Sequence, residues 1–249
     1  MRLLGLDFET TGLDTANDRV TEVGLCLWDV PTKRPLTTYS IFLFDEAMRE
    51  RFTAETVKMM HELCGITPAL LGEFGMAPGP QYAWMDEYCS RHRVEYIVAH
   101  NGENFDKPFL MAELARHGVE GKYLKTLPWI DTKMDIPHPT PPDSNKLKHL
   151  ALDAGFINPF AHRAVFDVLT MLRVLSNYPL DDVIAYSKVP FVTVRGVVSF
   201  EDRQLAKDQR FSWEKLGDKT YPKQWVKRIK VDKLEEEQKK CKFQVVKLD

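Results

Sequence analysis

The chain has 249 residues, of which 44% are hydrophobic and 28% charged, with a net charge of −2 at pH 7. This composition is typical of a globular protein, and the lack of any apolar run near 18 residues excludes a transmembrane helix. The length allows one large domain, or a medium domain with a small companion. The charge is uneven, because residues 1–186 carry 18 Lys and Arg against 26 Asp and Glu, whereas residues 187–249 carry 16 against 10.

The first residues, MRLLGLDFET, lack the basic head, apolar stretch and small-residue cleavage site of a signal peptide. The four cysteines are scattered and form no CxxC pair. We therefore expect free thiols in a reducing, cytoplasmic compartment, and no zinc site built from cysteines.

Three strands are expected first, over residues 2–8, 19–29 and 36–44, and their short connections predict an antiparallel meander. Helical patterns then alternate with two short strands. Helices are expected over 52–60, 80–93, 105–118, 146–156 and 162–175, and strands over 96–100 and 126–132. This order predicts an α/β fold, a mixed sheet with helices packed on it.

A boundary is expected near NYPLDDVIAYSKVP. We predict one domain over residues 1–180, a linker over 181–190 and a small basic α+β module over 191–249. The module's pattern indicates a strand over 191–200, a helix over 201–210, two short pieces around Trp213 and Trp225, and a charged helix or tail. Its positive balance favours an anionic partner, and a solvated lysine-rich surface is the simpler alternative.

Two acids stand inside the apolar stretch LGLDFETTGL. Residues two apart on a strand share a face, so Asp7 and Glu9 would lie side by side. Neighbouring carboxylates repel and are costly to bury unless a cation compensates their charge. The alternative is that the strand frays at Asp7 and both acids meet water.

Two later segments carry further polar residues. In AHNGENFD, Asp106 follows a buried strand and begins a helix, where it would at least stabilise the helix N-terminus. In HRAVFD, five residues turn a helix about 140° past a shared face, so we expect His162 in the preceding loop and Asp167 in the first turns. Taken alone, His162 is more simply interpreted as a surface residue and Asp167 as an acid in the first turn of a helix.

Together the three segments form an ordered set: DxE on a first strand, Asp after AHN-x3-F, and H-x4-D at a late helix. This set, over about residues 1–178, resembles the DnaQ-like (DEDDh) family of 3′–5′ exonucleases. The resemblance implies a ribonuclease H-like fold with a five-stranded mixed sheet. A sister family has Tyr four residues before the last Asp, where this chain has Arg163, so the sequence is similar to the His-type.

The resemblance also implies the chemistry. Asp7, Glu9, Asp106 and Asp167 would bind two Mg²⁺ or Mn²⁺ ions, and His162 would be the general base. The implied activity is release of nucleoside monophosphates from single-stranded or frayed DNA 3′ ends. The alternatives are an exoribonuclease or oligonucleotidase of the same family, and a non-catalytic nucleic-acid-binding module.

Further residues are implied in substrate binding. The small residues of TTG would let backbone N–H groups approach an anionic ligand, although an ordinary turn is the alternative. Phe105 is equally plausible as a core residue, and MHELCGIT departs from the family's His-Gly-Ile-Thr. The implied substrate-binding residues are Thr10, Thr11, Gly12, Leu13 (a wedge beside the terminal base), Gly65, Ile66, Asn101 and Phe105.

Residues 199–229 faintly resemble a small accessory module, with an incomplete match. Aromatic residues interleaved with cations suit a nucleic-acid surface, whereas a small domain also needs its aromatics, Trp213 and Trp225 among them, as a core. The candidate contacts are Lys215, Lys219, Lys223, Lys227 and Arg228. The expected partners are single-stranded nucleic acid, DNA favoured over RNA, and a replication or repair protein, with no membrane.

Overall fold

The computed structural model describes residues 1–139, 142, 144–214 and 223–248. The chain divides into two compact units, Met1–Ser187 and Lys188–Asp249. The segment predicted as a linker, 181–190, is mostly helix α7 (Leu180–Ser187), which packs Val183 and Ile184 into the core of the first unit. Pro179 lies directly before this helix, and its carbonyl accepts hydrogen bonds from the N–H groups of Asp182 and Val183.

Within the described residues, the first unit contains a five-stranded sheet in the order β3-β2-β1-β4-β5. Its strands are β1 (Arg2–Thr10), β2 (Val20–Asp29), β3 (Arg34–Phe42), β4 (Tyr96–Ala99) and β5 (Trp129–Asp131). The first three pair antiparallel, and β1, β4 and β5 pair parallel. The predicted mixed sheet and α/β fold class are thus confirmed.

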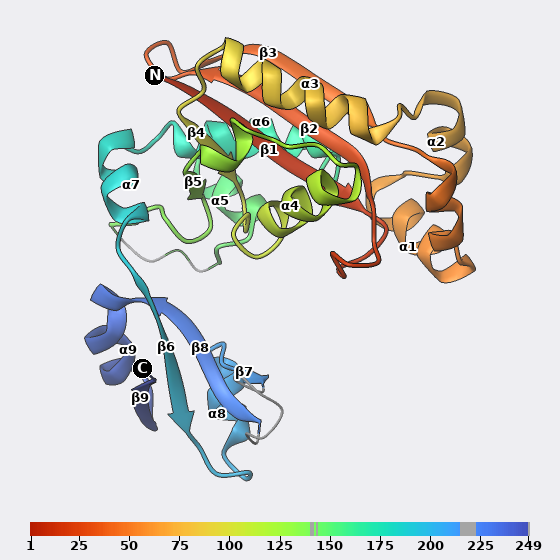
Figure 1. Ribbon diagram of the computed structural model, residues 1–249. Coiled ribbons are helices and arrows are strands. Elements are labelled where there is room, and N and C mark those ends of the chain that lie inside the picture. The colour runs from red at the N-terminus through yellow and green to blue at the C-terminus, as the bar shows by residue number, and fades with distance from the viewer. Residues whose placement is uncertain (140–141, 143, 215–222, 249) are drawn as a thin grey trace. The chain divides into compact units, whose positions relative to one another are not determined.

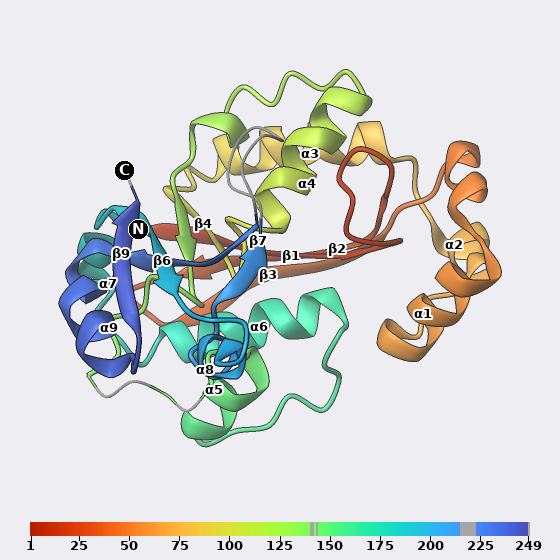
Figure 2. The same ribbon diagram turned by 90° about the horizontal axis from the view of Figure 1, so that it is seen from below.

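Helices cover both faces of this sheet. Figure 2 shows α3 and α4 on one face and α6 on the other, with α5 packed against α6. The helix predicted over 52–60 extends to Cys64, and the short helix α2 was not predicted. The helical segments are η1 (Glu46–Arg51), α1 (Ala54–Cys64), α2 (Pro68–Phe74), α3 (Pro78–Arg91), α4 (Asp106–Arg116), η2 (Leu124–Thr126), α5 (Leu147–Asp153) and α6 (Ala164–Leu175) (Figure 1).

The central strand β1 has two different faces. Leu4, Leu6 and Phe8 pack into the core formed with α3 and α4. The opposite face begins with Leu3, which packs against α6. Because side chains alternate along a strand, Asp7 and Glu9 lie on the face of Leu3. β1 therefore anchors the core with one face and presents two acids beside α6 with the other.

The second unit contains, within the described residues, a four-stranded sheet in the order β7-β8-β6-β9. Its core is formed by Val194, Phe211, Trp225, Ile229 and Val245, with other residues packed around them. The last strand was not predicted, because its residues read as part of a charged tail. The elements are β6 (Phe191–Val197), α8 (Arg203–Asp208), β7 (Ser212–Glu214), β8 (Gln224–Lys230), η3 (Val231–Lys233), α9 (Leu234–Lys240) and β9 (Gln244–Leu248).

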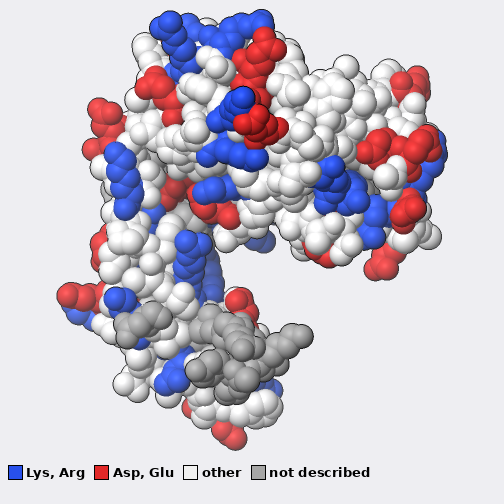
Figure 3. Space-filling model, viewed as in Figure 1, with Lys and Arg blue, Asp and Glu red and all other residues white. Residues whose placement is uncertain are grey.

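Among the residues that the structure describes, no helix combines the length and apolar character needed to cross a membrane. The four cysteines are buried, and all four are free thiols. Figure 3 shows Lys and Arg side chains interspersed with Asp and Glu over the face in view.

Candidate active site

The residues of the three sequence motifs meet near the end of β1. Asp106 is the first residue of α4, and Asp167 lies in the first turn of α6. Ligand atoms of Glu9, His162 and Asp167 all lie within 4.8 Å of one another. The backbone N–H of Phe8, between the two β1 acids, donates a hydrogen bond of 3.0 Å to Asp106 Oδ1.

The pKa of each of the four carboxyl groups is raised, and burial is the largest cause in every case. Burial and then the charge of Asp106 raise the pKa of Asp7 well above its usual range. Burial, followed by the charges of Asp167 and Glu22, raises the pKa of Glu9 to about 8. Burial also raises the pKa of Asp106 to about 8, and that of Asp167 above its ordinary value. Each shift disfavours the ionised form, and the charges of Arg163 on Glu9 and of His162 on Asp167 do not offset it.

This donor set fits a divalent cation. Asp106 is almost fully buried, and its Oδ2 atom has no hydrogen-bond partner among the described residues. A buried, unpartnered carboxylate oxygen is costly unless it coordinates a cation or is protonated. Carboxylate oxygens are the ligands that Mg²⁺ and similar hard ions prefer.

A buried ion pair fixes the start of α6. Glu22 lies opposite Glu9 in the β1–β2 register and is completely buried. It accepts hydrogen bonds of 3.1 Å from both Nε and Nη2 of Arg163, and one of 2.6 Å from Ser40 Oγ. The backbone N–H of Ala164 also donates to Glu22. The residue at the sister family's tyrosine position is therefore bound to β2.

A glycine lets α6 approach β2 closely. A Cβ atom at Gly24 would lie 2.3 Å from the carbonyl carbon of Ala164 and 2.4 Å from the nitrogen of Val165. Gly24 is the register partner of Asp7. Only a residue without a side chain permits this contact, which brings the first turn of α6 beside the acids.

The loop before α6 wraps the carboxylate of Asp167. His162 has a left-handed backbone with φ +63°, and its N–H donates to Asp167 Oδ2 at 2.9 Å. Asn158 Nδ2 donates to Asp167 Oδ1 at 2.6 Å. His162 lies in the loop and Asp167 in the first turn, as the spacing predicted. Asn158 was not predicted, because nothing in its sequence neighbourhood distinguishes it from an ordinary loop residue.

The loop after β1 is ordered by an acid that the sequence did not single out. Asp18 accepts hydrogen bonds from Thr11 Oγ1 at 3.0 Å and from the backbone N–H of Asp14 at 2.9 Å. Gly12 lies against Asp18, since a Cβ there would be 2.3 Å from Oδ2. Leu13 at the tip is 84% exposed. Thr10 Oγ1 donates to the Gly12 carbonyl at 2.6 Å, so the loop holds its shape internally.

The corner before α4 is also held by an acid. Asn101 has φ +70°, and its N–H donates to Asp131 Oδ1 at 2.8 Å. Asn101 Oδ1 accepts a hydrogen bond of 2.9 Å from Lys133 Nζ. Phe105 packs against Phe109, with ring centroids 4.9 Å apart, at the edge of the core. Asp131, at the end of β5, thus positions a predicted residue without having been predicted itself.

Two predicted nucleotide contacts follow α1. Gly65 ends that helix in a left-handed conformation with φ +72°. Ile66 is completely buried in a small cluster with Met60, Cys64 and Leu71. The turn after α1 directs the Ile66 side chain into the protein, so the predicted substrate contact at Gly65 and Ile66 would involve their backbone groups.

The candidate cations of the second unit differ in their surroundings. Lys215 and Lys219 lie outside the described residues. Lys223 and Arg228 are exposed, and the Arg228 guanidinium lies 4.4 Å from the ring centroid of Phe191. Lys227 Nζ forms an ion pair of 2.6 Å with Glu237, which leaves it poorly placed for a phosphate. Trp225 is buried as predicted, whereas Trp213, predicted as core, is 50% exposed.

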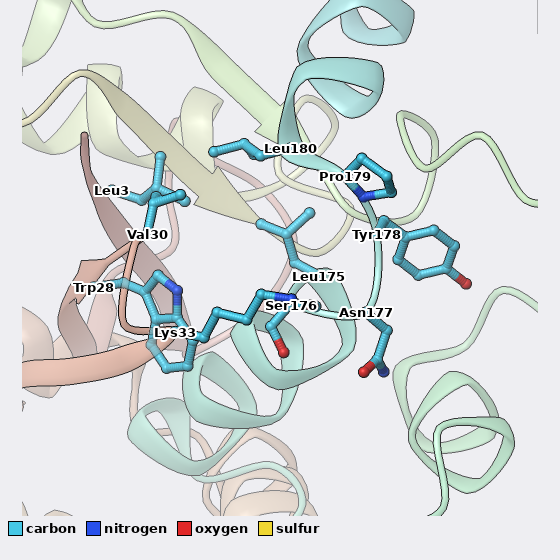
Figure 4. A pocket seen from close by; sticks show the side chains of 10 residues that line it. All are labelled: Leu3, Trp28, Val30, Lys33, Leu175, Ser176, Asn177, Tyr178, Pro179 and Leu180. Atoms are coloured by element: carbon cyan, nitrogen blue, oxygen red, sulfur yellow. Dashed lines mark hydrogen bonds between the residues drawn. The ribbon is translucent and has the colours of Figure 1, made fainter.

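A separate cavity of about 280 Å³ lies near the start of β1, away from the acids (Figure 4). Leu3, Trp28 and Leu180 are among its mainly apolar lining residues, and no carboxylate lines it. Lys33 Nζ donates a hydrogen bond of 2.7 Å to the Ser176 carbonyl at the end of α6. The Lys33 ammonium group therefore stabilises the fold. The described residues that line the cavity include none of the carboxylates found at the other end of β1.

Comparison with solved structures finds exonucleases. Exonuclease I of E. coli in complex with a dT13 oligonucleotide matches with a TM-score of 0.60 and 14% identity, over 99% of this chain and 65% of that one. The nuclease domain of 3′hExo, a DEDDh family member bound to rAMP, matches with a TM-score of 0.59 and 14% identity, over 72% and 92%. The chain therefore shares the fold of these exonucleases.

A further exonuclease I structure matches with a TM-score of 0.56 and 17% identity, over 78% of this chain. The chain spans about half of that protein, 48% of its length. No family model matches the sequence, and no curated protein does.

Proposed function

We propose that this chain is a metal-dependent 3′–5′ exonuclease that releases nucleoside monophosphates from single-stranded or frayed DNA 3′ ends. The observation that carries the proposal is the meeting of Asp7, Glu9, Asp106 and Asp167 with His162 at one end of the sheet. These residues come from three distant segments, and the pKa values of the carboxyl groups, raised mainly by burial, fit a cluster built for cations.

The four acids would hold two Mg²⁺ or Mn²⁺ ions. When bound, such ions activate a water molecule and stabilise the leaving 3′-oxygen. The imidazole of His162 accepts a proton from the attacking water as the new oxygen–phosphorus bond forms and the bond from phosphorus to the 3′-oxygen breaks. General base catalysis of this kind contributes about 10²- to 10⁴-fold. Asn158 and the His162 N–H keep the Asp167 carboxylate oriented.

The loop after β1 suits the terminal nucleotide. Asp18 fixes the loop, so Leu13 is presented to solvent without further ordering. We assign Leu13 as the apolar wedge beside the terminal base, and the backbone of Thr10, Thr11 and Gly12 as the contact to its sugar and phosphate. Phe105 and the backbone at Gly65 complete this set of contacts.

The second candidate is an exoribonuclease or oligonucleotidase with the same site. The 3′hExo neighbour is bound to rAMP and the exonuclease I neighbour to dT13, so ligands of both sugar types occur on this fold. E. coli exonuclease I is also known in a zinc-bound form with single-stranded DNA. DNA is favoured for this chain because its second unit supplies exposed cations suited to longer strands.

The second unit is proposed to hold single-stranded nucleic acid through Lys223 and Arg228, or to bind a replication or repair protein. Support for a protein partner is that one exonuclease I structure is a complex with SSB-Ct. Support for a nucleic-acid contact is the half-exposed Trp213 ring, since aromatic faces stack bases.

The test is degradation of 5′-labelled single-stranded DNA and RNA with Mg²⁺, with Mn²⁺ and with EDTA. We expect shortening from the 3′ end that needs the metal and prefers DNA. Asp7→Ala and His162→Ala should each lower the rate at least 100-fold. Glu73→Ala, at an exposed acid on α2, is the matched control and should retain the wild-type rate. Wild-type activity in Asp7→Ala would rule out the assigned site.

A further inference from the structure

Two aromatic rings lie open to solvent beside the candidate site. Phe160, in the loop before α6, is 56% exposed, and Phe166, in the first turn of α6, is 36% exposed. Their ring centroids are 4.8 Å apart. Each ring therefore supports the other, while much of Phe160 remains uncovered by the described residues of the chain.

The pair is attached to the acids through Asn158. The Oδ1 atom of Asn158 accepts the Phe160 N–H at 3.0 Å, and its Nδ2 atom donates to Asp167 Oδ1 at 2.6 Å. Phe166 directly precedes Asp167 in α6. The same amide thus holds the backbone of Phe160 and the carboxylate of Asp167, while the ring of Phe160 packs on that of Phe166.

Phe160 is also close in the chain to His162, whose ring reaches Glu9 and Asp167. Two residues of chain span at most about 7 Å. A base attached near a phosphate held at the acids is therefore within reach of the Phe160 ring. Bases stack on aromatic side chains with little dependence on sequence, because every base has a π-face.

We propose that Phe160, supported by Phe166, is a stacking site for one base of the strand upstream of the terminal nucleotide. This proposal rests on the proposed exonuclease activity and adds a contact to it. The site would take a base of a single strand irrespective of its identity. It would hold the strand in place while the terminal nucleotide is removed.

The decisive experiment pairs a protein change with a substrate change. Single-stranded oligothymidylates, each with one abasic residue at position 2, 3, 4 or 5 from the 3′ end, are assayed for removal of the first nucleotide. We expect the wild-type kcat/KM to fall about 5- to 150-fold at one of these positions, the range for loss of one stacked base. Phe160→Ala should slow the intact substrate similarly and show little further loss at that abasic position.

Phe160→Trp should restore both the rate and the abasic penalty, because it retains a stacking surface. Phe74→Ala, at an aromatic residue of α2 with a similar exposed fraction of 57%, is the matched control and should behave as wild type. Equal abasic penalties in wild type and Phe160→Ala at every position would overturn the proposal. An unchanged rate in Phe160→Ala would also overturn it and would direct attention to a protein partner for the pair.

A failure of the exonuclease proposal is distinguishable from a failure of stacking. If the wild-type protein hydrolyses nothing with any metal, base stacking is measured as quenching of the Phe160→Trp fluorescence by intact oligothymidylate in Mg²⁺. One of the four abasic strands should quench less than the intact strand, and Phe74→Trp should show no quenching difference among the strands. Identical quenching of Phe160→Trp by the intact strand and all four abasic strands would reject the stacking site independently of catalysis.

Discussion

Two carboxyl groups of the candidate site have a pKa near 8, Glu9 and Asp106, and burial is the main cause for each. A raised pKa means that the folded state holds a proton that the unfolded chain releases at lower pH. The resulting stability is fully present below about pH 4, and it is lost as the pH rises through 8. The metal-free protein should therefore be least stable at alkaline pH.

Thermal unfolding in EDTA at pH 5.5, 7 and 8.5 checks this expectation. The wild-type Tm should fall across the series, and Mg²⁺ or Mn²⁺ should raise the Tm most at pH 8.5, because a cation replaces the missing proton. Glu9→Gln should flatten the fall, since it removes one ionisable group. Glu73→Gln, which changes an exposed acid of α2, should leave the slope unchanged. A Tm that rises with pH in EDTA would contradict the argument.

The sequence motifs singled out residues that lie near one another at the end of β1, and their roles as metal ligands and general base stay predictions. Glu22, Asp18 and Asn158 were not predicted, because each acts through partners that only folding brings near, such as Arg163 for Glu22. Glu22 did leave a signal: it is a charged residue in the otherwise apolar run VTEVGLCLW, the same pattern that drew attention to Asp7 and Glu9.

The contact between β2 and α6 positions half of the candidate site. Glu22 binds Arg163 and the backbone of Ala164, and Gly24 removes the side chain that would separate the two elements. Two residues of β2, Glu22 and Gly24, thus set the position of α6. Because α6 carries Asp167 and the preceding loop carries His162, a change in this contact between β2 and α6 would displace both residues.

The Gly24→Ala variant tests this contact between β2 and α6. Its Cβ would overlap the backbone of Ala164, so the first turn of α6 must shift. We expect a loss of stability of about 1–3 kcal/mol, as for other overpacked sites, and at least a 100-fold loss of nuclease rate. Gly72→Ala in α2 is the matched control, because nothing lies within 4 Å of its added Cβ. Unfolding by urea and the rate at saturating Mg²⁺ measure the two effects, and a fully active Gly24→Ala would refute the idea.

The elements differed in how well the sequence predicted them. The sheet of the first unit was predictable because β1, β2, β4 and β5 are mainly buried and apolar, and because turn residues separate the first three strands. α2 was missed because it has only seven residues and begins at Pro68. β9 was missed because KKCKFQVVKLD mixes charges with few apolar residues, and its pairing with β6 depends on partners about 50 residues away.

At the scale of the whole molecule, we expect hydrolysis in the first unit and binding of the strand in the second. The first holds the acids, and the second carries more cations than anions. If Lys223 and Arg228 contact phosphates, their removal should weaken binding of long strands and leave the chemistry intact. Each contact to a single strand contributes about 0.7 to the slope of log affinity against log salt concentration.

The double variant Lys223→Ala/Arg228→Ala should therefore lower that slope by about 1.4 on a 30-nucleotide strand. Its turnover of a dinucleotide should equal that of wild type, since the acids are unchanged. Lys125→Ala, at an exposed lysine of the first unit, removes a charge without affecting the proposed surface and should not change the slope by as much. Affinity titrations at several salt concentrations measure the slope of log affinity against log salt concentration. An unchanged slope in the double variant would exclude these contacts.

The alternation of side chains along β1 has a consequence for how the protein folds. A slip of one residue in the pairing of β1 would exchange its faces, so Leu4, Leu6 and Phe8 would meet α6 while Asp7 and Glu9 entered the apolar core beside α3 and α4. Such a chain would lose its core and its carboxylate cluster in the same step. The register of β1 thus determines both the packing of the core and the position of its two acids.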